Sequence, residues 1–414
     1  MSERDSRLRI IVLGYLVRGP VGGLAWHHLQ YVMAAAAIGH DLYFIEDSDD
    51  YPSCYVPTTD TTGIDPGYGL AFATAVFERV GFADRWAYYD AHRAFWCGPA
   101  AGRAPALCRS ADLLINVSGM NPIRPWLAEV PARALIDTDP AFTQIRHLVD
   151  AAARARTEAH NVFFTFGENL AAGRADLPDD GFAWQPTRQP LALEAWPLTP
   201  PPRTGLLTTV MQWQSYPAQT HQGRRYGMKA EAFDPLIDLP HRAGRRFALA
   251  VGGAPEAQLR SFGWRLFDPI AVTRDPWTYQ RFIQRSMGEF AVAKHGYVVS
   301  HSGWFSERSA CYLASGRPVV VEDTGFSDWL PVGEGVIGFT TADEALAGIA
   351  LIDAHYTAHC RAAREIAETF FDGRQVMAAL IEAACNEAPN ARAPSHSACL
   401  ATDPGPDGAG RTPC

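Results

Sequence analysis

Short apolar runs that end in polar residues alternate with helix-period segments along most of the chain. Residues 8–14 are such a run, residues 24–38 carry apolar side chains at helical spacing, and residues 41–47 are a second run. Strand, helix and strand in this order form a βαβ unit, which needs a parallel sheet with helices on its faces. The sequence therefore predicts an α/β fold.

The alternation occurs in two series, separated by a Pro-rich, non-periodic stretch at residues 186–204 that is typical of a linker. A chain of 414 residues is long enough for two cores. Further strand candidates lie at 112–117, 134–137, 162–166, 205–211, 246–251, 296–300 and 317–322. We predict an N-terminal Rossmann-like domain at 1–187, a linker at 188–204, a C-terminal Rossmann-like domain at 205–353, closing helices at 354–387 and a disordered tail at 388–414.

Composition limits the function classes. The 36 Lys and Arg residues against 45 Asp and Glu residues give a net charge of -9, so we expect no nucleic-acid partner. The apolar run near the N-terminus is broken by Arg18 and is too short to span a membrane. The eight cysteines contain no CxxC pair, which favours reduced thiols over a disulfide framework or a zinc site. We expect a cytoplasmic protein with no metal and no stable membrane insertion.

The stretch from His301 to Gly325 carries the clearest candidate site. It reads as a strand end, a polar turn, a helix start and then Gly-Arg-Pro before a second apolar strand. The free backbone N–H groups and the dipole of a helix N-terminus suit an anion such as a diphosphate. Arg308 adds a charged donor. The alternative is an ordinary βαβ unit in which Ser306 and Ser309 only cap the helix.

Two motifs resemble GT-B glycosyltransferases, in which two Rossmann-like domains face a cleft. Gly22 and Gly23, His27 and the pair Gly39-His40 match the GG…H…GH spacing that opens many family-four enzymes. Residues 298–326, VVSHSGWFSERSACYLASGRPVVVEDTGF, are similar to the HCGW-type donor motif of family one and to the EAMASGxPVV stretch of family four. The resemblance covers most of residues 8–385 and implies C-terminal helices that pack back toward the N-terminal domain.

The sequence departs from each family in a different way. Family-four enzymes place a Glu, which contacts the donor ribose, where this chain has Cys311. A thiol is a poor hydrogen-bond acceptor for a hydroxyl. In the family-one pattern, the helix between Gly-Trp and the next Gly is shorter by two residues. Glu289 or Glu307 is a possible substitute, and the sequence does not choose between them.

The resemblance implies a nucleoside-diphosphate-sugar donor, no bound metal and no other cofactor. The diphosphate would lie against the helix start, and the donor sugar hydroxyls at the turn after the next strand. Trp277 is a candidate for stacking on the nucleotide base. Lys294 is interpreted as a surface helix residue, and a charge near the diphosphate is the alternative. The donor-site candidates are Gly303, Ser306, Glu307, Arg308, Ser309, Asp323, Thr324, Gly325 and Trp277.

His27 is the candidate catalytic base, since it lies near the start of a helix that points into the expected cleft. Asp47 or Asp49, at the tip of the next strand, would orient the imidazole, and His28 is a close competitor. A reaction that retains configuration needs no strong base, which weakens this assignment. The candidates on the acceptor side of the cleft are Gly22, Gly23, His28, Asn121, Asp137 and Glu168.

Together these features predict a glycosyltransferase that moves a sugar to a small-molecule acceptor, of the secondary-metabolite kind. Two alternatives stay open. A hydrolysing nucleotide-sugar epimerase of the same fold would need paired carboxylates in the cleft, and a two-lobed small-molecule binding protein would show a similar alternation. The sequence leaves the donor base and sugar, the acceptor, the stereochemistry and the oligomeric state undetermined.

Overall fold

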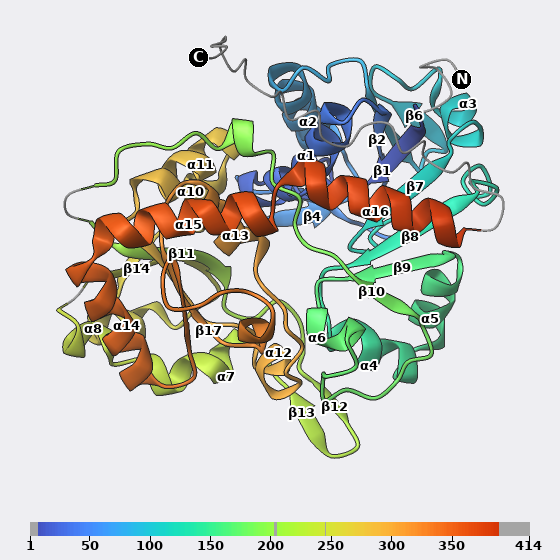
Figure 1. The fold of residues 1–414 in the computed structure, drawn as a ribbon. Coiled ribbons are helices and arrows are strands. Elements are labelled where there is room, and N and C mark those ends of the chain that lie inside the picture. Colours follow the sequence, from blue (N-terminus) through green and yellow to red (C-terminus); the bar gives the residue numbers. More distant parts are fainter. Residues whose placement is uncertain (1–6, 203–204, 245, 389–414) are drawn as a thin grey trace, which may run out of the picture.

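The protein is described by a computed structural model over residues 7–202, 205–244 and 246–388. These residues form two large sheets in separate halves of the molecule, with helices packed around each (Figure 1). Alternate residues of a strand face opposite sides of its sheet. In the first strand, Ile10 and Val12 belong to one apolar cluster, and Ile11 and Leu13 belong to another. The first sheet is therefore buried on both faces, as a parallel sheet requires.

The first sheet has eight strands in the order β10-β9-β8-β7-β1-β2-β5-β6. All neighbours are parallel except β6, which runs antiparallel to β5. The strands are β1 (Arg9–Leu13), β2 (Asp41–Asp47), β5 (Trp86–Asp90), β6 (Phe95–Cys97), β7 (Leu113–Val117), β8 (Ala132–Asp137), β9 (Val162–Thr165) and β10 (Trp184–Pro186).

The second sheet has six parallel strands in the order β15-β14-β11-β16-β17-β18. They are β11 (Leu207–Gln212), β14 (Phe247–Gly252), β15 (Arg265–Phe267), β16 (Gly288–Ala291), β17 (Val319–Glu322) and β18 (Val336–Phe339). Two short hairpins lie outside the sheets: β3 (Cys54–Val56) with β4 (Thr61–Gly63), and β12 (Gln219–His221) with β13 (Arg224–Tyr226).

The helices of the N-terminal half are α1 (Gly22–Ala37), α2 (Gly67–Arg79), α3 (Ala104–Arg109), α4 (Phe142–Val149), α5 (Ala151–Glu158) and α6 (Glu168–Ala171). Those that follow are α7 (Lys229–Phe233), α8 (Leu239–Arg242), α9 (Glu256–Ser261), α10 (Pro269–Thr273), α11 (Pro276–Arg285), α12 (His295–Val299), α13 (Glu307–Ala314), α14 (Ala342–Ala354), α15 (Tyr356–Phe370) and α16 (Gly373–Glu387). In the part of the chain that is described, no helix is long and apolar enough to cross a membrane.

The last two helices run across both halves (Figure 1). Helix α15 packs against α13 beside the second sheet, whereas α16 packs against α1, β7 and β8 of the first. Met377, Leu380 and Ile381 of α16 share an apolar cluster with Ile10 and Val12 of β1. The C-terminal helices therefore pack back on the N-terminal half through α16, as the family resemblance implies.

The two halves also meet through α1 and α11. A Cβ atom at Gly22 would lie 2.4 Å from the carbonyl oxygen of Asp275, so only glycine allows this approach. Asp275 caps α11 by accepting from the backbone N–H of Thr278. The indole of Trp26 donates to Pro276 across the same contact at 2.7 Å.

One predicted strand is wrong. Residues 296–300 form most of α12, and the strand of this region is β16, eight residues earlier. A short apolar run cannot distinguish helix from strand by periodicity. β16 was not predicted, because it contains Glu289 and a carboxylate is rare in a central strand. The domain limits remain a proposal, and residues 389–414 of the predicted tail lie outside the described residues.

Candidate functional site

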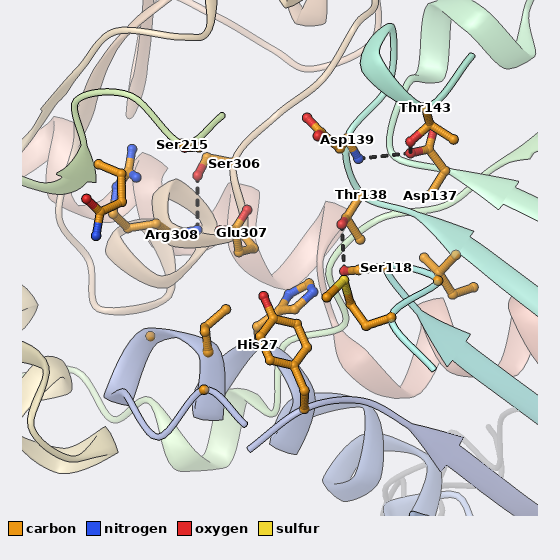
Figure 2. Close-up of a pocket in the computed structure, with 18 of the residues that line it drawn as sticks. His27, Ser118, Asp137, Thr138, Asp139, Thr143, Ser215, Ser306, Glu307 and Arg308 are labelled. Atoms are coloured by element: carbon orange, nitrogen blue, oxygen red, sulfur yellow. Dashed lines mark hydrogen bonds between the residues drawn. The ribbon is translucent and has the colours of Figure 1, made fainter. Parts of the chain in front are cut away.

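A cavity of about 890 Å³ lies where loops at the carboxyl ends of both sheets meet. This is the edge at which open parallel sheets bind ligands. The start of α1 and the loops after β1, β7 and β8 contribute one wall. The loop after β11, Lys229, Lys294 and the start of α13 contribute the other. Figure 2 shows His27 on one side of this space and Ser306 with Glu307 on the other.

The N-terminus of α13 opens onto the cavity through Ser306, Glu307 and Arg308. The Ser306 hydroxyl accepts from the backbone N–H of Arg308 at 3.2 Å, so it is the cap of this helix (Figure 2). Both sequence interpretations thus apply to Ser306, which caps the helix and lines the cavity. Ser309 instead lines a small adjoining cavity of about 20 Å³.

The Arg308 side chain is committed to a buried ion pair. Its Nε donates to the carboxylate of Glu289, which has no exposed surface, and its Nη1 donates to the carbonyl of Val210 at 2.9 Å. The charge that the sequence assigned to a diphosphate is therefore balanced within the protein. Glu289 acts as the partner of Arg308 and is not free to replace the missing ribose ligand.

Sequence reasoning missed Lys229 and misplaced Lys294. These are the only lysines in the sequence, and both line the cavity. Lys294 Nζ lies 2.7 Å from Asp139 Oδ1 and 2.7 Å from the hydroxyl of Tyr216, and it joins the two halves. Lys229 has no carboxylate within 4.0 Å among the described residues. Burial, and then the charges of Arg308 and Lys294, lower the pKa of Lys229 to about 7.

His27 is held by a residue of the predicted linker. Its Nδ1 lies 2.5 Å from Oε1 of Gln189, while Nε2 of that glutamine donates to the carbonyls of His27 at 3.1 Å and Pro190 at 3.3 Å. The two carbonyls fix the orientation of the amide, so Oε1 must accept from a protonated Nδ1. Within the described structure, Nε2 of His27 has no hydrogen-bond partner. Burial lowers the pKa of His27, although Glu307 opposes this shift. The side chain is a neutral imidazole with a free lone pair at the cavity.

Asp47 and His28 do not act on His27 in this way. The Asp47 carboxylate accepts from Arg124 at 2.9 and 3.0 Å, and Asp47 does not line the cavity. His28 is fully buried, with Nδ1 2.8 Å from the carbonyl of Leu24, and burial sets its pKa well below the usual value. Gln189 therefore takes the orienting role that the sequence gave to an aspartate.

Among the acceptor-side candidates, Gly23 and Asp137 line the cavity, and Asn121 and Glu168 do not. Asp137 already accepts four hydrogen bonds, from Thr143, Thr165, Gln144 and the backbone of Asp139 (Figure 2 shows two of them). Its role is to hold the turn that carries Asp139. Asn121 bridges the backbones of Gly14 and Asp47, and Glu168 pairs with Arg188 at 2.5 Å.

The predicted donor-sugar residues also lie away from the cavity lining. The Asp323 carboxylate accepts from Gly325 and Ser327, and the Thr324 hydroxyl donates to the carbonyl of Trp304. Gly303, at φ +75°, allows a close approach to Asn169 of the other half. Trp277 does not line the cavity, and one face of its ring is covered by the guanidinium of Arg79, 3.7 Å from the ring centre.

Comparison by sequence finds no matching family model and no matching curated protein. Solved structures are similar across 91% of the chain. An alpha-glucosyltransferase in complex with UDP-glucose and DNA containing an abasic site has a TM-score of 0.56 at 9% identity, with 99% of its chain covered. HepE of Anabaena in complex with UDP-glucose has a TM-score of 0.53 at 11% identity, with 99% of its chain covered. AviGT4, a glycosyltransferase involved in avilamycin A biosynthesis, has a TM-score of 0.51 at 14% identity, with 97% of its chain covered.

The chain has the GT-B fold. The cavity is then the cleft between the two GT-B halves, with α1 and α13 as its opposed helix starts. Lys229 and the start of α13 lie on the wall that belongs to the C-terminal half.

The exclusion of nucleic acid as a partner is wrong. It rested on the net charge of -9, yet GT-B structures similar to this chain hold DNA, including a 13-mer with a central A:G mismatch. The net charge of a whole chain does not report the charge of one cleft wall.

Proposed function

We propose that this protein is a glycosyltransferase that moves a sugar from a nucleoside-diphosphate sugar to a small-molecule acceptor without a metal. One observation carries the proposal. The free Nε2 of His27 and the start of α13 with Lys229 line the same cavity from opposite halves. A base and an anion site that face each other across a cleft match the two tasks of sugar transfer, which are acceptor deprotonation and stabilisation of a leaving diphosphate.

The diphosphate would bind at the first turn of α13. Ser306 occupies one backbone N–H group of that turn, and the helix dipole favours an anion beside the others. Lys229 supplies the positive charge that Arg308 cannot fully offer, because Arg308 is paired with Glu289. A bound diphosphate stabilises the ammonium form of Lys229 and so restores a charge that burial disfavours.

The acceptor would bind on the side of His27. With Nδ1 held by Gln189, Nε2 accepts the proton of the attacking hydroxyl in a reaction that inverts configuration. In a reaction that retains configuration, the same atom positions the acceptor hydroxyl or a donor hydroxyl. The epimerase alternative is not favoured, because Asp137 and Asp139 are both engaged, so that Glu307 is left as a single free carboxylate in the described cavity lining and no free pair exists there.

A panel of nucleoside-diphosphate sugars, incubated with the protein, tests the proposal. Small hydroxyl compounds and a DNA duplex serve as acceptors. We expect acceptor-dependent release of free nucleoside diphosphate and transfer to a small acceptor. Transfer to the duplex alone would overturn the acceptor class, and an isomerised donor without release would favour the epimerase. Calorimetry that detects no nucleotide binding would contradict both enzyme functions.

Lys229 gives a pH dependence to donor binding. The pKa in the free protein is about 7, and a bound diphosphate raises it, so binding above pH 7 takes up a proton. The affinity for UDP should fall as the pH rises, by up to about tenfold per pH unit. Calorimetric titration with UDP at several pH values below and above 7 measures this change in affinity. Lys229→Arg keeps its positive charge as the pH rises, so its affinity for UDP should not depend on pH. If the affinity of this variant falls with pH as steeply as that of the wild type, the dependence belongs to another group.

A further inference from the structure

Arg18 is a buried arginine of the cavity lining that the proposed reaction does not use. It lies in the loop between β1 and α1, is 3% exposed and lines the cavity. Its Nη2 donates to the carbonyl of Met120 at 2.9 Å, and its guanidinium lies 5.5 Å from the ring centre of Tyr15. Its Nε is buried without a hydrogen-bond partner, and no partner of Nη1 occurs among residues 7–202, 205–244 and 246–388.

Glu46 is the ion-pair partner of Arg18 but accepts no hydrogen bond from its guanidinium. The carboxylate of Glu46 accepts from the backbone N–H groups of Leu16, Val17 and Arg18 at 2.6, 2.8 and 2.7 Å. The nearest guanidinium nitrogen, Nε, is 3.5 Å away and outside hydrogen-bond geometry. The loop backbone thus uses three lone pairs of Glu46. The Nε group of Arg18 is enclosed, so the donors that Arg18 keeps for a ligand are those of Nη1.

The N-terminal wall around Arg18 offers further cationic groups, and its carboxylates in the described chain are all engaged; Glu307, on the opposite wall, is the cavity carboxylate with no ion pair among the described residues. Arg146 of α4 and Arg156 of α5 line the same cavity. Arg156 is anchored to Asp49 at 2.8 Å, while Arg146 has no carboxylate within 4.0 Å in the described residues. The carboxylates that line this half are Asp137, with four hydrogen bonds, and Asp139, which pairs with Lys294.

We propose that the acceptor is a small acidic molecule whose carboxylate or phosphate binds Arg18, with Arg146 as a second contact. The proposal rests on the proposed sugar transfer and names its acceptor class. A buried guanidinium with unused donors is costly, and an anion with two acceptor oxygens matches its planar fork. Because Arg18 and His27 flank the start of α1, the acidic group would hold the acceptor with a hydroxyl near Nε2 of His27.

Calorimetry on the protein saturated with UDP tests this proposal with matched pairs of probes. Each acid is compared with its neutral counterpart: 4-hydroxybenzoate with 4-hydroxybenzamide, glucuronic acid with glucose, and glucose 6-phosphate with glucose. We expect at least one acid to bind about tenfold or more tightly than its counterpart, on the scale of a charged hydrogen bond. That preference should be lost in Arg18→Met and reduced in Arg146→Met. The carboxylates and the phosphate show which kind of anion is preferred.

The controls separate this proposal from folding and from donor binding. Arg18→Lys keeps a charge at the site, Arg146→Met changes an exposed side chain, and Arg260→Met removes an arginine on α9 outside the cavity lining. All should bind UDP as the wild type does, and failure of the wild type to bind UDP would instead contradict the proposed function. Equal affinities within every pair, no probe bound, or an acid preference that survives in Arg18→Met would overturn the proposed binding of an acidic acceptor at Arg18. A DNA duplex that binds in place of the probes would overturn the small-molecule assignment.

Discussion

Replacement of His27 by alanine should lower the turnover number of sugar transfer by about 10²- to 10⁴-fold, the range for loss of a general base. The affinity for UDP should change little, because the proposed diphosphate site is at the opposite wall. The neutral tautomer that Gln189 imposes gives the reason: Nε2 has a lone pair at the cavity and no competing partner within the described chain. Steady-state kinetics and calorimetric titration with UDP measure the two quantities separately.

Two further variants define this role. Gln189→Leu removes the acceptor for Nδ1 and should lower turnover and alter its pH profile, whereas Gln189→Glu should raise the pKa of His27 and move the profile to higher pH. His241→Ala is a matched control, since that histidine is exposed on α8. A His27→Ala enzyme that turns over at the wild-type rate would dismiss His27 as the base.

Replacement of Arg308 by alanine should lower the free energy of unfolding by about 3–5 kcal/mol, the cost of leaving one partner of a buried ion pair alone. Glu289 has no exposed surface, and its Oε2 is already without a partner, so the carboxylate would lose its only strong contact. Urea denaturation followed by circular dichroism measures this change. Weaker UDP binding by Arg308→Ala alone would not separate a donor contact from a damaged site.

The double variant with Arg308→Met and Glu289→Gln resolves that ambiguity. It removes both charges, so its free energy of unfolding should recover a large part of the loss. A double variant that is no more stable than Arg308→Ala would contradict the assigned pairing. In the recovered protein, a tenfold loss of UDP affinity would show a direct donor contact, and wild-type affinity would limit Arg308 to the ion pair.

The sequence predicted the fold better than it predicted the contacts of the site. Apolar runs revealed β1, β2 and β17, because strands of a buried parallel sheet need few polar residues. They missed β16, where burial of Glu289 depends on an arginine nineteen residues later. The edge strands β15 and β18 are short and give a weak signal.

Individual site residues were predictable where the chemistry is local. Ser306 caps α13, and His27 lies near the start of α1, so sequence position alone places both at the cavity. The partner of His27 was not predictable, because Gln189 lies 162 residues away in a stretch that reads as a linker. Asp47 was excluded by its ion pair with Arg124, which lies 77 residues further along the chain and belongs to no local motif. One unused signal was available: a chain that uses arginine almost everywhere has only two lysines, and both line the cavity.

A crystal structure of the protein with UDP bound tests the central claim most directly. We predict diphosphate oxygens within hydrogen-bond distance of the backbone at the start of α13 and of Nζ of Lys229, with His27 facing the diphosphate across the cleft. A nucleotide bound elsewhere, or a diphosphate that contacts neither α13 nor Lys229, would contradict the claim that this cleft is the donor site of a glycosyltransferase.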